Sequence, residues 1–415
     1  MKLAMWRKKA LRNLAVIEGS SAAPTATLLR AADFRSFFMG GFECSSQRRR
    51  DGRRLDLIAQ TGHDLRAAED YQLLAAHGMR TVRDGVRWHL VERRPRRFEL
   101  DNFLPMLRAA LHSRTQVIWD LLHYGWPSTV DIWRPEFVER FVDFVRVIAQ
   151  TVRNESDEIP YYVPVNEMSF FAWGGGDVGY LNPFARDRGG ELKRILVRAS
   201  IAAIDAIRDI DPRARFVVAE PLIHVFPRSD SVDDVQAAAS YNESQFEATD
   251  LLTGRLEPEL GGRADYLDIF GVNYYFRNQW VDEGHGVFLG DGRYRPLSEL
   301  LTMASRRYDR PIFIAETGTE AGGRAPWLHY VCDEVRDARR SGTHVEGICL
   351  YPILNHRGWD DERHCHNGMF CGIEPDGSRL VHDRLAAELN RQQLLFAQER
   401  RDMDPATAAS AGTVR

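Results

Sequence analysis

Ile312-Phe-Ile-Ala-Glu-Thr-Gly318 is a strand-like apolar run that ends directly at a carboxylate, Glu316. The earlier segment Val163-Pro-Val-Asn-Glu167 has the same form and ends at Glu167. Short runs rich in β-branched and aromatic residues predict β-strands. These two segments therefore predict two strands, each of which delivers a glutamate at its carboxyl end.

Strand-like runs of this kind recur along the chain and alternate with helical patterns. The eight candidate strands are Phe37–Phe42, Met79–Val82, Thr115–Trp119, Tyr161–Val165, Arg215–Ala219, Leu267–Val272, Pro311–Ala315 and Val345–Leu350. Apolar residues at helical spacing lie between them, for example over Phe137–Ile148, Leu192–Ala206, Val232–Leu252 and Trp327–Arg340. Strand–helix alternation predicts a parallel sheet, and eight units predict a single (β/α)8 barrel with inserted loops rather than an open sheet.

The predicted barrel occupies residues 34–397 of the 415-residue chain. Residues 1–33 are expected to be an irregular lead-in, and residues 398–415 a disordered tail without a periodic apolar face. The helical pattern closes near Arg384–Leu395. Residues 277–295, which contain four glycines, are expected to form an inserted hairpin beside the sixth strand.

The composition argues against several classes of partner and cofactor. The 55 lysines and arginines nearly balance 59 aspartates and glutamates, which argues against a nucleic-acid partner. No apolar run approaches the ~18 residues of a membrane span. The five cysteines are sparse, so a reducing, cytoplasmic location is expected. Neither a dinucleotide fingerprint nor a phosphate loop is present, and no cofactor is predicted. A homo-oligomer is left open.

A metal site is also not predicted. His364, Cys365, His366 and Cys371 have side chains of the kind that bind zinc. Adjacent residues do not converge readily on one ion, and no second cluster completes a ligand set.

Every candidate strand is followed by polar or aromatic residues. In order along the chain these are Glu43 and Gln47, Arg83, Asp120 and His123, Asn166 and Glu167, Glu220, Asn273 to Tyr275, Glu316, and Tyr351, Asn355 and Trp359. The carboxyl ends of the strands form the catalytic face of a (β/α)8 barrel. Two carboxyl groups ~5–5.5 Å apart on that face would suit a retaining glycosidase. Glu167 and Glu316 are therefore the predicted catalytic pair.

Six segments in the right order resemble the family 1 glycoside hydrolases, the β-glucosidase family. They are Phe38-Met-Gly-Gly-Phe-Glu-Cys-Ser-Ser-Gln47, Val82-Arg-Asp-Gly-Val-Arg-Trp88, Leu121-Leu-His-Tyr-Gly-Trp-Pro127, Val165-Asn-Glu-Met168, Asp268-Ile-Phe-Gly-Val-Asn-Tyr-Tyr275 and Ala315-Glu-Thr-Gly318. The resemblance extends over roughly Phe37 to Asp383. It implies a retaining β-glycosidase with Glu316 as nucleophile and Glu167 as acid/base.

The resemblance also implies roles for the neighbouring side chains. It places Gln47 at the glycone hydroxyls, Arg83 beside the nucleophile, His123 on the sugar, Asn166 at the 2-hydroxyl and Tyr275 against the nucleophile. Asn273, Tyr351 and Trp359 complete the predicted substrate-binding set, and Trp359 and Trp126 are candidates for stacking on a sugar face. The expected ligand is a carbohydrate or glycoside.

The sequence departs from the family at the eighth strand. Tyr351 stands where the family has a tryptophan, and Gly358 where it has the acidic residue that binds the far hydroxyls of the glycone. Arg357, Asp360, Asp361 or Glu43 could reshape this pocket, so glucose or galactose specificity does not carry over. The missing carboxylate leaves an alternative open, a weakly active or inactive sugar-binding protein on a glycosidase scaffold.

Overall fold

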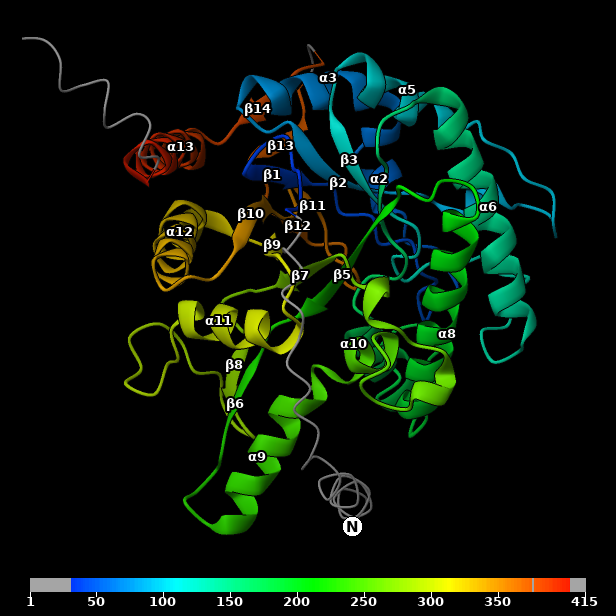
Figure 1. The fold of residues 1–415 in the computed structure, drawn as a ribbon. Coiled ribbons are helices and arrows are strands. Elements are labelled where there is room, and N and C mark those ends of the chain that lie inside the picture. The colour runs from blue at the N-terminus through cyan, green and yellow to red at the C-terminus, as the bar shows by residue number, and fades with distance from the viewer. Residues whose placement is uncertain (1–30, 375–376, 404–415) are drawn as a thin grey trace, which may run out of the picture.

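A computed structural model describes residues 31–374 and 377–403 as a closed eight-stranded parallel barrel surrounded by helices (Figure 1). The strand order around the barrel is β1-β10-β9-β7-β5-β4-β3-β2, so strands that are neighbours along the chain are also neighbours in the sheet. The predicted (β/α)8 fold is confirmed. Most of the predicted lead-in and tail lies outside the described residues.

The barrel strands agree closely with the apolar runs of the sequence. They are β1 (Phe38–Gly41), β2 (Thr81–Gly85), β3 (Gln116–Asp120), β4 (Tyr161–Val163), β5 (Arg215–Pro221), β7 (Ile269–Asn273), β9 (Ile312–Thr317) and β10 (Val345–Leu350). Several extend by one or two residues into the polar segment that follows the run. Arg83, Glu220, Asn273 and Glu316 are therefore strand residues, with the orientation that the barrel wall imposes on them.

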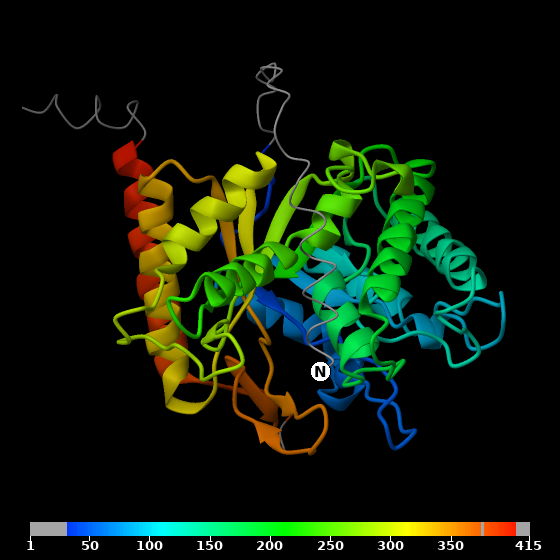
Figure 2. The same cartoon turned by 90° about the horizontal axis from the view of Figure 1, so that it is seen from below.

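Helices cover the outside of the barrel. The longer ones are α3 (His63–Ala76), α5 (Leu104–His112), α6 (Glu136–Glu155), α8 (Gly189–Arg208), α11 (Leu297–Tyr308), α12 (Arg324–Arg340) and α13 (Asp383–Met403). In α6 the buried residues Phe137, Phe141, Phe144 and Ile148 recur every three or four positions and form one apolar stripe. Figure 2 shows α12 and α13 side by side at one edge of the barrel.

Two apolar clusters divide the core. The larger one packs the helices against the outer wall. The smaller one fills the barrel interior with inward-facing residues that include Met39, Ile118, Val217, Phe313 and Tyr351. Packing is tight near the site, because a Cβ at Gly41 would lie 2.2 Å from the ring of Tyr351. The interior is therefore a packed core, and the chemistry is confined to its rim.

The structure corrects several local expectations. The helix expected over Val232–Leu252 is two helices, α9 (Val232–Ser244) and α10 (Glu247–Leu252). Residues 277–295 contain the expected hairpin, with an antiparallel bridge between Trp280 and Gly286, but β8 (Gln279–Val281) also pairs in parallel with β6 (His224–Phe226) from the preceding loop. Together with α9, this pair forms a lobe beside the barrel (Figure 1). Helix α13 runs to Met403, past the predicted boundary at residue 397.

The segment after β10 forms two further small sheets. One pairs β11 (His356–Arg357) with β12 (His364–Cys365), and the other pairs β13 (Phe370–Ile373) with β14 (Arg379–Val381). Figure 2 shows this segment in orange against one side of the barrel. Short helices α2 (Leu57–Gln60), α4 (Trp88–Val91) and α7 (Met168–Phe171) occupy other loops. Within residues 31–374 and 377–403, no helix has the length and apolarity needed to cross a membrane.

Candidate active site

Glu316 lies at the carboxyl end of β9 and is almost completely buried. Arg83 Nη1, from β2 across the barrel, donates to Glu316 Oε1 at 3.0 Å. The Tyr275 hydroxyl donates to Oε2 at 2.9 Å. Both carboxylate oxygens therefore accept a hydrogen bond, one of them from a permanent cation, which favours the ionised form of Glu316.

Glu167 follows β4 with a left-handed backbone, φ 46°. Its N–H donates to the Ala219 carbonyl of β5 at 2.9 Å, which fixes the turn. Asn273 Nδ2 donates to Glu167 Oε1 at 2.8 Å, and the Tyr124 hydroxyl donates to Oε2. Both donors are neutral, and within the described residues no cation pairs with the Glu167 carboxyl as Arg83 pairs with Glu316.

Asn273 brings the two carboxyl groups to one place. Its backbone is paired in register with Glu316 between β7 and β9, while its side-chain amide binds Glu167. Two residues further along, Tyr275 binds Glu316. The end of β7 therefore contacts both carboxyl groups of the predicted catalytic pair.

Burial is the main cause that raises the pKa of both Glu167 and Glu316. At Glu316 the Arg83 guanidinium opposes this rise, and the neighbouring Glu167 charge adds to it. At Glu167 the hydrogen bonds from Tyr124 and Asn273 lower the pKa again. Two buried carboxyl groups this close to each other do not ionise independently.

His123 and Asp120 extend the site beneath the carboxyl pair. Asp120 Oδ2 accepts from Arg83 Nη2 at 2.7 Å and lies 3.0 Å from His123 Nδ1. Burial alone would lower the pKa of His123, but the Asp120 hydrogen bond and charge raise it. Arg83 is thus held between Asp120 and Glu316, and His123 is fixed by the same carboxylate.

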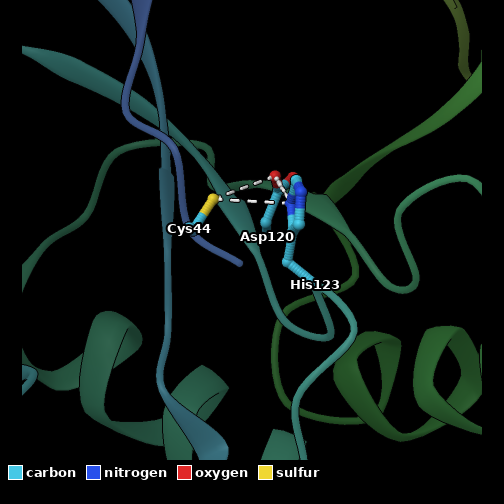
Figure 3. Close-up of side chains that lie close together, drawn as sticks. All are labelled: Cys44, Asp120 and His123. Atoms are coloured by element: carbon cyan, nitrogen blue, oxygen red, sulfur yellow. Dashed lines mark hydrogen bonds and ion pairs between the residues drawn. The ribbon is translucent and has the colours of Figure 1, made fainter. Parts of the chain in front are cut away.

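Cys44, Asp120 and His123 converge so closely that their chemistry resembles a metal site (Figure 3). One ligand-type atom from each lies within 4.8 Å of the others. The Asp120 oxygen that faces Cys44 and His123 already accepts from the Arg83 guanidinium, which would repel a cation. Burial also raises the pKa of the Cys44 thiol well above its usual range, so it is a neutral donor. These residues fit a hydrogen-bonded support for Arg83 better than a metal ligand set.

The remaining predicted binding residues differ in accessibility. Asn166 is buried, its oxygen accepts from Arg83 at 3.0 Å and its nitrogen donates to Tyr124 at 3.2 Å. Tyr351 is also buried, with its ring parallel to His123. Gln47 lies at the rim with its buried Oε1 unpartnered among the described residues. Trp359 is half-buried and meets Tyr124 edge-on.

Trp126 is largely buried, and it also lines a groove at the rim together with Arg48 and Asn182. Its ring packs against Phe137 and Phe171, and its N–H donates to the Val130 carbonyl at 3.0 Å. The stacking expected of Trp126 stays a prediction. Of the two tryptophans singled out from the sequence, Trp359 keeps the more accessible ring.

The fold is shared with known glycosidases, although the sequence is far from theirs. No protein-family profile matches the chain, and no curated protein sequence matches it. The family 1 β-glucosidase from Thermotoga maritima superposes with a TM-score of 0.65 at 16% identity, covering 80% of this chain and 87% of that one. Its complex with glucoimidazole gives 0.66 at 15% identity, covering 80% and 86%. The AHE enzyme from Alicyclobacillus herbarius gives 0.70 at 18% identity, covering 88% and 99%.

The chain has a glycosidase-like TIM-barrel fold. At this level of identity the similarity extends to the fold, and the functional roles must be argued from the site itself. The site contains groups that the predicted set lacked, chiefly Tyr124, Asp120 and Glu43. Asp120 and Glu43 are among the polar residues that the sequence places at strand ends, and Glu43 is one of those expected to reshape the pocket. Tyr124 follows His123 and carries no signal in the sequence that marks it as a partner of Glu167.

Two further features border the site. Glu220, at the end of β5, is buried and accepts from the Ser169 N–H at 3.1 Å. Burial raises its pKa to about 8, and the Glu167 charge adds to the rise.

A groove of about 120 Å³ lies between the loops that follow β1, β3 and β4, lined by Arg48, Trp126, Ser128, Val130, Asp131, Ile132, Asn182 and Pro183. It adjoins Gln47 along the chain and opens at the rim.

Proposed function

We propose that this protein is a retaining β-glycosidase that hydrolyses, or transfers, a β-linked sugar. The observation that carries the proposal is the buried pair Glu167 and Glu316, joined through the end of β7 but held by different partners. Arg83 opposes the rise that burial causes in the pKa of Glu316, and Glu167 has no such cation beside it among the described residues, so we expect the proton shared by the pair to rest on Glu167. This asymmetry supports one carboxyl group as nucleophile and the other as acid.

In the first step, Glu316 attacks the anomeric carbon while Glu167 donates its proton to the glycosidic oxygen. The bond to the leaving group breaks and an ester forms between the sugar and Glu316. In the second step, Glu167 takes a proton from water, which attacks the anomeric carbon and releases Glu316 as a carboxylate. Two inversions give net retention. We expect the groove lined by Arg48 and Trp126 to receive the leaving group.

The side chains around the two carboxyl groups would either position those groups or bind the sugar. Arg83 and Tyr275 orient the nucleophile and favour its charged form, and Asn273 holds the acid/base. Among the predicted binding residues, Gln47, His123 and Trp359 are the groups we expect to contact the sugar, while the engaged amide of Asn166 and the buried ring of Tyr351 support them.

A second candidate is a sugar-binding protein with little or no turnover. It is favoured by the loss of the family's glycone carboxylate at Gly358. The two candidates differ in a single measurement, because only the glycosidase forms a covalent intermediate on Glu316.

The test uses a panel of 2-deoxy-2-fluoro β-glycosides with good leaving groups, including gluco, galacto, manno and xylo configurations. We expect one of them to inactivate the protein and to add the mass of one fluoro-sugar to the peptide that contains Glu316. Glu316→Gln should not be labelled, and Glu155→Gln, which alters an exposed carboxylate paired with Arg108, should be labelled normally. Labelling at another carboxylate would overturn the assignment.

Turnover of aryl β-glycosides provides an independent measurement. Glu167→Gln should slow hydrolysis of substrates with poor leaving groups more than of those with good ones, and added azide should restore turnover as a glycosyl azide. A wild-type protein that binds sugars but hydrolyses nothing across the panel would favour the second candidate.

A further inference from the structure

Glu43 is a third carboxylate at the active-site rim, outside the predicted catalytic and binding sets. It follows β1 directly, and its side chain retains only 9% of its exposure. Oε1 accepts from the Ser45 N–H at 3.0 Å and from the Ser45 hydroxyl at 2.6 Å. The same oxygen lies 3.8 Å from His123 Nε2. Glu43 is therefore fixed in orientation by its own loop and faces the histidine predicted to bind the sugar.

The Glu43 carboxylate has few partners that offset the cost of burying its charge. Among the described residues, no lysine or arginine lies within ion-pair distance of it, and Oε2 accepts no hydrogen bond. A largely buried carboxylate without such partners is costly unless a ligand supplies donors. Its charge reaches the site: burial raises the pKa of Tyr275 and Tyr351, and the Glu43 charge raises both further.

A second acceptor on the same loop, in Gln47, also lacks a hydrogen-bond donor. Gln47 Oε1, four residues along the same loop, is buried and unpartnered among the described residues. Glu43 Oε2 and Gln47 Oε1 are thus two acceptors without a hydrogen-bond donor among the described residues, and His123 lies beside Glu43. A ligand that satisfies this arrangement carries hydroxyl donors and no negative charge.

We propose that Glu43 binds a pair of hydroxyl groups on an uncharged pyranose and determines glycone specificity, in place of the carboxylate missing at position 358. This inference rests on the proposed function and names the substrate class of its site. Oε2 accepts from both hydroxyls, because the two acceptor positions of Oε1 are already occupied by Ser45. Sugars with a carboxylate or phosphate at that position are excluded by repulsion.

The test combines Glu43→Gln and Glu43→Ala with deoxy substrates. The best aryl β-glycoside of the panel is compared with its 3-deoxy, 4-deoxy and 6-deoxy analogues in each variant. Glu43→Ala should lower kcat/KM by about 100-fold on the parent sugar, because hydrogen bonds to a charged group are lost. It should have little effect on the analogue that lacks the bound hydroxyl, because that analogue has already lost the hydrogen bond that the substitution removes. Glu43→Gln should show the same pattern with a smaller loss.

Glu362→Gln is the matched control, because Glu362 is an exposed rim carboxylate paired with Arg49 and Arg53. It should leave kcat/KM unchanged on every substrate. Equal losses of kcat/KM on all analogues in the Glu43 variants would identify a structural role and overturn the inference. An unchanged kcat/KM of these variants on the parent substrate would also overturn it, although the proposed function would then stand.

Failure of the proposed function gives a different result. If the wild type hydrolyses nothing, calorimetric titration with the parent methyl β-glycosides measures Glu43 directly. Binding by the wild type that is weakened about tenfold or more in Glu43→Gln supports the inference without catalysis. Unchanged affinity, or no binding by the wild type, overturns it.

Discussion

Tyr124 and Glu167 both have a left-handed backbone, with φ of 63° and 46°, and the Tyr124 hydroxyl donates to Glu167 Oε2. Non-glycine residues in this conformation cost about 1–3 kcal/mol each and persist where surrounding contacts fix them. Here the two turns aim a donor and a carboxyl group at one another from different strands. Tyr124 is thus a positioning residue for the proposed acid/base.

Tyr124→Phe should shift the pH profile upward. The lost donor favoured the ionised form of Glu167, so its removal raises the pKa of that carboxyl. The basic limb of kcat/KM should move to higher pH, with a fall in the maximum of about tenfold from lost orientation. Tyr180→Phe, which removes a rim hydroxyl bonded to Asp360, should leave the limb in place. A downward shift in Tyr124→Phe would contradict the assignment.

Arg83→Met should destabilise the protein as well as inactivate it. Arg83 is fully buried between Asp120 and Glu316, so its loss leaves two uncompensated carboxylates and costs about 3–5 kcal/mol. Urea unfolding should show a smaller loss at pH 5 than at pH 7, because the unpaired carboxyl groups then become protonated. Arg108→Met, which breaks an exposed pair with Glu155, should cost far less, because solvent screens that pair. Similar losses in both variants would contradict the buried-pair interpretation.

His63 should make the stability fall in alkaline solution. Its ring lies 2.8 Å from carboxylate oxygens of both Asp70 and Asp84, and Arg379 also binds Asp70. Burial opposes protonation, but the two aspartates prevail and raise the pKa of His63 to about 9. Because the unfolded value is about 6.5, this stabilisation is complete below pH 6.5 and is lost as the pH rises through 9.

Urea unfolding at pH 6 and pH 9.5 measures this contribution. The wild type should lose on the order of 3 kcal/mol more than His63→Gln over that interval, since the glutamine carries no proton to release. His112→Gln, at an exposed position in the last turn of α5, serves as the control and should behave as the wild type. Parallel pH dependence in the wild type and His63→Gln would contradict the prediction.

Glu220→Gln should stabilise the protein above neutral pH. Burial raises the folded pKa of Glu220 to about 8, whereas the unfolded value is about 4.3. The unfolded chain therefore releases this proton first, and wild-type stability falls as the pH rises from about 4.3 to 8. The stability of the variant does not fall in this way. Its free energy of unfolding relative to the wild type should therefore grow by on the order of 2 kcal/mol between pH 5 and pH 8. A constant difference in unfolding free energy across this range would rule out titration of Glu220.

The strands and their polar ends could be predicted because each is local. An apolar run marks a strand wherever it occurs, and in a parallel barrel the residue after the run lies on the catalytic face. Glu167, Glu316, Arg83 and Tyr275 were found this way or through the motifs around them. The lobe of β6, β8 and α9 could not be predicted, because its parallel pairing joins two loops distant in the chain.

The partners within the site were also beyond the sequence. Tyr124 binds Glu167 because two left-handed turns face one another. Asn273 reaches Glu167 because β5 alone separates β7 from β4, and the Ala219 carbonyl of β5 binds the Glu167 N–H. Trp126 packs against Phe137 and Phe171 from neighbouring helices, which its position in the sequence does not indicate. Side-chain direction at loop positions depends on contacts between elements, which spacing along the chain does not encode.

Periodicity and strand-end polarity are local properties, so the barrel, its eight strands and the residues at their carboxyl ends can be predicted from the order of residues. Which of those residues meet depends on how the strands close into a barrel. Arg83 contacts Glu316 and Asp120, and Tyr124 and Asn273 bind Glu167. Glu43 faces His123, with no lysine or arginine beside it in the described part of the chain. Charge and hydrogen bonding act over a few ångströms in space, and closure of the barrel brings these distant residues within that range.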